Sequence, residues 1–462
     1  MRRRPLRRPL LIAAAALAAT TPIAAQQFRD ETPGPNLRLD LTTGVRVTDN
    51  EARVADPPDG TSTLSETRLG LTFDTRTRTQ RLTARAGGVF EFGAYADEEL
   101  ADPGFQSPFL ALDYGLRRKN AELSFDARYS EFDVGSERTF DLDGEDLIVD
   151  RGTRANTRIG AAITLGLQGP LRYSAEALFT ERTFFDTTDP DLTDLSRFSL
   201  DQRLSLALTR STRLTFDLDY AQTDEADGTD REEISTDYLL GLEHVTTRGL
   251  TASARFGLGV EETTRTIDGD RSTDREEEPI LTLSVTQALP NGAVSGEFNR
   301  RLTAQGLRSN LTFGRSMDLR VGGLEATLGV AELGEDDLTV IGSLTYDRPT
   351  PTGVLGLRLS RRVNYTDDTD VERFDAAMNY RHQIDRLSSV ALDLGLASSI
   401  SLDPEEADRE QANLRVTYTR QVTRDWDVNV GYAYSSSQSD DDDRVTENAV
   451  FANVSRSFDL LR

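Results

Sequence analysis

A two-residue repeat of apolar side chains, which recurs in segment after segment from residue 37 onward, constrains the fold most strongly. Because successive side chains of a β-strand point to opposite faces, the repeat places apolar residues on one face. The opposite face is charged or small, as at Glu122, Ser124, Asp126 and Arg128. About 22 such segments occur with no helical pattern between them, so the sequence predicts an all-β fold. One clear example is the Leu, Ala, Ala, Phe, Leu and Val found at residues 250, 252, 254, 256, 258 and 260.

Short turns and long acidic loops alternate along the chain. The short turns include 119–120, 169–170, 209–212, 246–249 and 290–292. The longer connections, rich in Asp, Glu, Gly, Ser and Thr, include 96–107, 135–150, 186–194, 261–278, 397–410 and 435–444. Short turns at one rim and long loops at the other are typical of outer-membrane barrels, whereas a soluble sandwich has no reason to sort its connections. We therefore expect a transmembrane antiparallel up-and-down β-barrel of about 22 strands (range about 18–24), with periplasmic turns and acidic extracellular loops.

Composition taken alone indicates a different class of protein, because 37% of the residues are hydrophobic, 28% are charged and the net charge is −25. That balance is typical of a soluble or partly disordered chain. A barrel, however, exposes only alternate residues to lipid, while the others face a lumen that can stay wet. The sheet must also close on itself, because every backbone N–H and C=O inside hydrocarbon has to be paired.

The N-terminus has the layout of a secretory signal peptide. Arginines near the start precede an apolar stretch over 10–19 and small residues before Gln26. We expect a cleaved signal peptide at 1–25, a short segment at 26–36 and the barrel at 37–462. The protein is therefore expected to be exported through the inner membrane and to lie in the outer membrane.

Several kinds of chemistry find no support in the residues. The chain has no cysteine and two histidines, which excludes disulfides and thiolate metal sites and disfavours a multi-histidine metal centre. The acidic balance argues against a nucleic-acid partner. The acidic run 141–146 has its glycine at the wrong position for the calcium-binding loop of an EF-hand. The two histidines, His244 and His382, are expected at the periplasmic rim. We therefore expect neither an enzyme nor a bound metal or cofactor.

In this layout the chain resembles the outer-membrane β-barrel porins of Gram-negative bacteria, in particular a poorly characterised type with a signal peptide and a plain barrel. The resemblance implies a passive channel for small hydrophilic solutes, surrounded by outer-membrane lipid and lipopolysaccharide and inserted by the barrel-assembly machinery. Its oligomeric state is left open. Active-uptake receptors of the outer membrane also use about 22 strands, but a globular plug fills their barrel. Because the first expected strand, 37–47, follows so soon after the signal peptide, we expect no plug domain.

Strand parity assigns charged residues to the inner face of the barrel, and a place near a strand end assigns aromatic residues to the membrane interfaces. The charged residues expected to line the lumen are Arg85, Glu91, Arg128, Arg158, Glu176, Arg358, Arg362 and Arg415. The aromatic residues expected on the lipid-facing side, near the membrane interfaces, are Tyr95, Tyr114, Tyr129, Tyr220, Tyr365, Trp426, Tyr434 and Phe458. Because the lumen arginines oppose the acidic loops, the expected channel has only a weak preference for cations.

Two other interpretations stay open on the residues alone. A non-transporting structural protein of the envelope, or a barrel associated with exopolysaccharide export, would show no conductance steps in a bilayer. A soluble exported β protein would lack the heat-modifiable migration on SDS gels that folded barrels show, and it would stay in solution without detergent.

Overall fold

The computed structural model describes residues 34–51, 53, 57, 59–96, 103–133, 152–187, 192–226, 231–267, 270–333, 337–365, 370–401, 408–439 and 444–461. The expected signal peptide and the expected loop 135–150 lie outside these residues. No helix among the described residues has the length and apolar character needed to cross a membrane.

In the described part of the chain, 22 antiparallel strands form one sheet, which confirms the predicted fold class and strand number. The strands are β1 (Gly34–Thr48), β2 (Ser62–Arg76), β3 (Gln80–Ala94), β4 (Gly104–Arg117), β5 (Ala121–Asp133), β6 (Thr153–Leu165), β7 (Leu171–Phe185), β8 (Asp194–Ala207), β9 (Thr212–Ala226), β10 (Arg231–Val245), β11 (Leu250–Ile267), β12 (Asp270–Leu289), β13 (Gly292–Thr303), β14 (Gly306–Asp318), β15 (Gly323–Leu333), β16 (Asp337–Thr350), β17 (Gly353–Tyr365), β18 (Asp370–Gln383), β19 (Ser388–Ser401), β20 (Arg409–Gln421), β21 (Asp427–Ser439) and β22 (Val445–Leu461).

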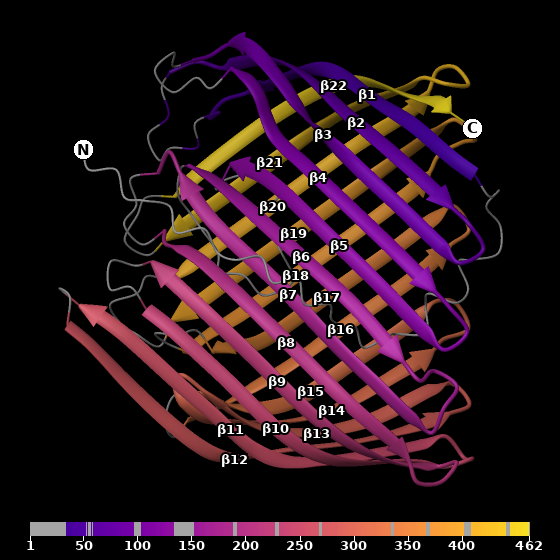
Figure 1. Cartoon of the computed structure of the whole chain (residues 1–462). Helices are drawn as coiled ribbons and strands as arrows, with labels where there is room; N and C mark the ends of the chain where they lie inside the picture. Colours follow the sequence, from indigo (N-terminus) through magenta and orange to yellow (C-terminus); the bar gives the residue numbers. More distant parts are fainter. Residues whose placement is uncertain are drawn as a thin grey trace.

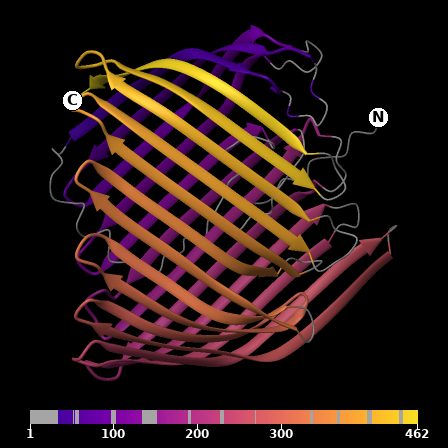
Figure 2. The ribbon, with the colours of Figure 1, turned by 180° about the vertical axis from the view of Figure 1, so that it is seen from behind.

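The sheet closes into a barrel through its first and last strands. Each strand pairs with its neighbours in sequence, and β1 pairs with β22 in a register that places Val47 opposite Val450. Figures 1 and 2 show the tilted strands running around a continuous wall, with the first strands beside the last. Closure leaves every strand of the described sheet with two neighbours, which is what a sheet in hydrocarbon requires.

The two rims differ only in part as the sequence predicts. At the short-turn rim, strands are joined by two to five residues, as at 118–120 or 290–291. The turn after Asn291 needs a glycine, because Gly292 has a φ of 126° and a Cβ there would lie 2.1 Å from the Ser316 carbonyl oxygen. The opposite, loop rim carries the longest connections, for example 186–193 between β7 and β8. It also has connections as short as the turns, because only two residues join β11 to β12 and β13 to β14.

Several expected boundaries are wrong by a few residues, and one expected loop is mostly strand. Residues 261–278 form the ends of β11 and β12, which stay paired until Ile267 meets Asp270. In Figure 1 these two strands extend beyond their neighbours at the lower left. Both faces of the paired ends of β11 and β12 are polar, so the apolar repeat stops there. The backbone hydrogen bonds between the two strands continue, because they do not depend on an apolar face. Cross-strand contacts such as the 3.1 Å hydrogen bond between the Thr264 and Thr273 hydroxyls support this pairing.

The same effect shortens other connections. The expected loops 397–410 and 435–444 lose their first residues to β19 and β21, and 96–107 loses its last residues to β4. At the start of the barrel, β1 begins at Gly34, inside the segment expected to precede the first strand.

The two faces of the wall are inverted relative to a soluble protein. Leu240 in β10 and its cross-strand neighbour Phe256 in β11 are about 60% exposed (58% and 62%), although both are large and apolar. The adjacent Leu239 is buried on the other face, as is Asp217 opposite it on β9. The most deeply buried side chains therefore include charged groups on the inner face, while the apolar stripe points outward.

Candidate functional site: the inner wall of the barrel

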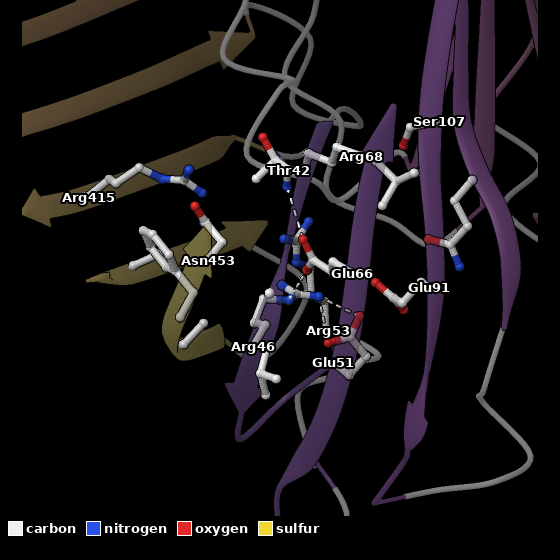
Figure 3. Close-up of a pocket in the computed structure, with 17 residues that line it drawn as sticks. Thr42, Arg46, Glu51, Arg53, Glu66, Arg68, Glu91, Ser107, Arg415 and Asn453 are labelled. Atoms are coloured by element: carbon white, nitrogen blue, oxygen red, sulfur yellow. Dashed lines mark hydrogen bonds and ion pairs between the residues drawn. The ribbon is translucent and has the colours of Figure 1, made fainter. Parts of the chain in front are cut away.

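One cavity identifies the inner face. It has a volume of about 310 Å³, and its lining includes Arg46 (β1), Glu66 (β2), Glu91 (β3) and Arg415 (β20) (Figure 3). The outermost of these residues, Arg415 and Glu91, lie on the first and last of six consecutive strands, β20 to β3 through the closing seam. Their side chains can therefore share a cavity only on the concave side of the wall. Residues directly opposite each other in antiparallel strands share a face, so the register extends this assignment around the barrel.

A cluster of ion pairs joins the first strands to the last one. Arg46 contacts Glu51 at 2.6 Å, Glu66 at 3.0 Å and Glu447 at 3.0 Å. Arg53, from the loop after β1, contacts Glu447 at 2.8 Å. Figure 3 shows Arg46, Glu51, Arg53 and Glu66 pointing toward one another in the lining of the cavity. We call these five residues the seam cluster, because Glu447 lies on β22 and the other four on β1, β2 and the loop between them.

Burial is strongest at Glu447, whose side chain is 5% exposed and which also accepts a 2.9 Å hydrogen bond from the Thr48 hydroxyl. Glu51 lies in the loop after β1, and burial raises its pKa to about 7. The nearby carboxylates of Glu91 and Glu447 add to this rise, whereas Arg46 opposes it by attracting the charged form. The cluster therefore contains a carboxyl group that takes up a proton near neutral pH.

A row of carboxylates crosses the inner wall elsewhere. Glu176 (β7), Asp201 (β8), Asp219 (β9) and Asp237 (β10) are directly opposite one another in successive registers. Like charges at directly opposite positions repel, and the arginines on the same strands, such as Arg203, offset part of that repulsion. We call these four residues the acidic row.

Two further groups of ion pairs are buried on the inner face. Arg373 and Asp375 in β18 are at most 2% exposed and lie 3.0 Å apart, and Arg362 of β17 contacts the same aspartate at 3.2 Å. Asp217 of β9 is equally buried and pairs with Arg203 of β8. A buried charge that loses its partner is costly, so the two pairs that join different strands, Arg362 with Asp375 and Arg203 with Asp217, favour one register.

The eight charged residues expected to line the lumen all occupy inner-face positions by register, although they do not form one group. Glu91 and Arg415 line the cavity of Figure 3, and Arg362 binds Asp375. Arg128 on β5 and Arg158 on β6 are directly opposite each other. The remaining three lie apart, Glu176 in the acidic row, Arg85 opposite Thr72, and Arg358 opposite Thr345. Their part in permeation stays a prediction.

The aromatic residues expected on the lipid-facing side do not all lie there. The outward register is shared by Tyr114, Tyr129, Tyr220, Tyr434 and Phe458, as expected for the lipid-facing side. Tyr95 departs from the expectation, because its hydroxyl donates a 3.4 Å hydrogen bond to Glu91 on the inner face. Tyr95 follows the last residue of β3 and has the same parity as Glu91, so the alternation of β3 already places it on the inner side. Tyr365 ends β17, and its side chain lies outside the described part of the chain.

Trp426 sits in the turn before β21, where the guanidinium of Arg456 stacks on its ring at 5.2 Å. The same guanidinium lies 4.5 Å from the ring centre of Phe458 and 3.9 Å from Asp425. Arg456 belongs to the outer face, and these contacts hold its charge at the short-turn rim, where a charged group avoids hydrocarbon.

Sequence reasoning missed the seam cluster. Parity places Arg46, Glu66 and Glu447 on inner faces, which is a usable signal for each residue. It carries no information on which strands meet, and Arg46 and Glu447 are 401 residues apart in the chain. The acidic row escaped for a related reason, since only the register shows that Asp201, Asp219 and Asp237 are directly opposite.

The histidines lie near the short-turn rim as expected. His244 Nδ1 is 3.0 Å from the Thr212 hydroxyl, and His382 Nδ1 is 3.1 Å from the Thr352 hydroxyl. Among the described residues, no group of three or more His, Cys, Asp or Glu side chains has the arrangement that holds a metal ion. The absence of an enzyme activity stays a prediction.

Comparison with known proteins gives similarity at the level of fold. No family model and no curated protein matches the chain. Among solved structures, it is similar to the FrpB iron transporter from Neisseria meningitidis, with a TM-score of 0.60 and 10% identity over 93% of this chain and 83% of that chain. It is also similar to the siderophore receptor PirA from Pseudomonas aeruginosa (TM-score 0.51, 11% identity, 93% and 81% covered).

A third similar structure is a mutant of the ferric enterobactin receptor PfeA from Pseudomonas aeruginosa, with a TM-score of 0.53 and 8% identity over 93% of this chain and 81% of that chain. At such identities the similarity shows a shared fold and nothing about ligands. None of these three is described as a porin, so the porin type expected from the sequence stays a proposal. The chain therefore shares the closed-barrel fold of FrpB, PirA and PfeA.

Proposed function

We propose that the protein is a passive channel of the bacterial outer membrane for small hydrophilic solutes. The observation that carries the proposal is the division of the closed wall into an apolar outer face and a charged inner face. Large apolar side chains such as Leu240, Phe256 and Leu328 are exposed outward. A closed sheet of this kind is stable in a bilayer and offers solutes a polar lining.

The lining supports a weak preference for cations. The acidic row places four carboxylates at directly opposite positions on β7 to β10. Carboxylate rows raise the local concentration of cations and repel anions. Arginines elsewhere on the inner face, among them Arg128, Arg158 and Arg415, act in the opposite sense and keep the preference weak.

Reversal potentials in planar bilayers test this proposal. Under a gradient of potassium chloride, we expect discrete conductance steps and a reversal potential that is modestly displaced toward the cation equilibrium value. Clear anion selectivity, or the absence of steps in several lipid compositions, contradicts the proposal. Replacing an exposed charge at the short-turn rim, such as Arg386→Gln, serves as a control that should leave the reversal potential unchanged.

The proposal includes a location and its partners. The outer face fits outer-membrane lipid, the acidic loop rim fits divalent cations that bridge to lipopolysaccharide phosphates, and insertion would rely on the barrel-assembly machinery. Export would use residues 1–25 as a cleaved signal peptide. Fractionation of cells and N-terminal sequencing of the mature protein check both points, and recovery from the soluble periplasmic fraction contradicts them.

A second candidate is a receptor for ferric chelates, which the fold shared with FrpB, PirA and PfeA favours. Equilibrium binding of iron-loaded siderophores to the purified barrel separates the two candidates. Saturable binding without single-channel conductance supports the receptor, whereas conductance without saturable binding supports the channel.

A further inference from the structure

Part of one hairpin leaves the barrel wall. The ladder between β12 and β13 ends where Leu281 pairs with Arg300, and the ladder between β14 and β15 begins where Asn310 pairs with Ala331. Between these points, β13 and β14 pair only with each other, from Arg301 opposite Arg308 to the turn at Gly306. Residues 301–309, which we call the hairpin tip, therefore lie outside the backbone ladders of both neighbouring strands, and at its base the Ser309 N–H donates a 2.6 Å hydrogen bond to the Glu332 side chain of β15.

The hairpin tip lies inside the barrel. Leu302 is 6% exposed and packs with Leu239 of β10 and Ile280 of β12. Both partners belong to the inner face, because Leu239 alternates with the outward-pointing Leu240 and Ile280 pairs with Gly257, which is opposite Leu239. An apolar residue of β13 can reach these two side chains only by crossing the inner side of β11.

A glycine on β11 makes room for this packing. A Cβ at Gly259 would lie 3.2 Å from the Cβ of Leu302, tighter than ordinary van der Waals contact. β13 also contacts β11 although β12 lies between them in the sheet. The side of the hairpin tip that would face outward by parity thus packs against the inner wall of the barrel. The contacts among Leu302, Leu239 and Ile280 hold it there.

The hairpin tip also places a positive charge beside the acidic row. Arg301 interacts electrostatically with Asp237, the last member of that row. The neighbouring positions of the row, Asp219 and Asp201, follow on β9 and β8. A solute that passes this level of the barrel therefore meets carboxylates on the wall and a guanidinium on the hairpin tip.

We propose that the hairpin tip is a fixed constriction that narrows the lumen beside the acidic row and that Arg301 lowers the cation preference there. The proposal deepens the channel function and rests on it. The apolar contacts of Leu302 position the hairpin tip, and Arg301 sets the charge that solutes meet. No rearrangement is required, because the tip occupies this place in the structure already.

Cross-linking tests the placement of the hairpin tip independently of transport. Because the chain contains no cysteine, paired cysteines report on single contacts. We expect rapid disulfide formation under mild oxidation in the double variant Gly259→Cys with Leu302→Cys. A second pair, Ile280→Cys with Leu302→Cys, covers the case in which the first does not fold. Heat-modifiable migration shows that each variant is a folded barrel.

The control pair is Pro279→Cys with Leu302→Cys. If β13 continued along β12 in the register that ends at Leu281, Leu302 would be opposite Pro279. Disulfide formation in the control pair, or in none of the three pairs, overturns the proposal.

Conductance tests the role of the hairpin tip. Replacing residues 302–307 by Asn-Gly should raise single-channel conductance and admit larger neutral polyethylene glycols. Arg301→Gln should increase the cation-to-anion permeability ratio by about two- to threefold. If the unmodified protein conducts and both variants behave like it, the constriction is refuted while the channel function stands. If the unmodified protein and the shortened variant both fail to conduct, the channel function itself is refuted.

Discussion

Removing Arg46 should destabilise the barrel more than removing any exposed surface arginine. The substitution Arg46→Met keeps an unbranched, flexible stem and deletes the charged guanidinium. It leaves Glu51, Glu66 and Glu447 without the guanidinium that contacts all three within 3.0 Å. Loss of one partner from a buried ion pair is costly because the remaining charge stays desolvated.

The magnitude follows from the exposure of the partners. Glu447 is 5% exposed, while Glu51 and Glu66 are about one-fifth exposed. Breaking a fully buried pair costs about 3–5 kcal/mol, and the contact of Arg53 with Glu447 compensates part of it. We therefore expect Arg46→Met to lower the free energy of unfolding by about 3 kcal/mol.

Urea unfolding of the barrel in lipid vesicles measures this change, with fluorescence of the single tryptophan, Trp426, as the signal. The matched control is Arg38→Met, also on β1, whose partner Asp40 and guanidinium are 36% and 52% exposed. Such an exposed pair contributes at most about 1 kcal/mol. If Arg46→Met costs no more than Arg38→Met, the seam cluster does not stabilise the closure of the barrel.

Three other outcomes are expected. Folding raises the pKa of Glu51 from 4.5 to about 7, so the folded state holds an extra proton between these values. The free energy of unfolding should therefore fall as the pH rises across this interval, by at most about 3 kcal/mol, and Glu51→Gln should flatten the slope in urea titrations at several pH values. The double variant Asp201→Asn with Asp219→Asn should shift the reversal potential toward anions, and an unchanged potential would exclude the acidic row from the conduction path. Leu240→Arg puts a charge on the outer face at mid-strand and should cost about 2–4 kcal/mol in vesicles, whereas a negligible cost would argue against lipid contact there.

Much of the fold could be predicted because its determinants are local. Strand number and the face of each residue follow from a repeat of two, which any short window of sequence displays. The prediction was wrong where the apolar repeat stops and the strand does not. In β11 and β12, residues 261–278 stay paired through the backbone although both faces are polar, so charge content was a poor guide to the end of the strand.

Less of the candidate site could be predicted. Parity assigned Glu91, Glu176 and Arg415 to the inner face, but it could not show that Glu91 and Arg415 share a cavity through the closing seam. The expectation for Tyr95 rested on its place near a strand end, but Tyr95 has the same parity as Glu91 and bonds to it. Contacts between distant strands depend on closure and register, and a single sequence encodes neither in a local pattern.

By itself, the sequence determined which residues point to lipid and which point inward, because side-chain direction along a strand alternates whatever the strand's neighbours are. Only the tertiary structure decided which inward residues meet. Closure brings Arg46 to Glu447, and the register aligns the acidic row. The hairpin tip breaks the parity rule outright, since Leu302 has the parity of the outer face and yet packs inside the barrel. A strand that leaves its sheet no longer shares the sheet's two faces, and that departure is a property of the whole barrel.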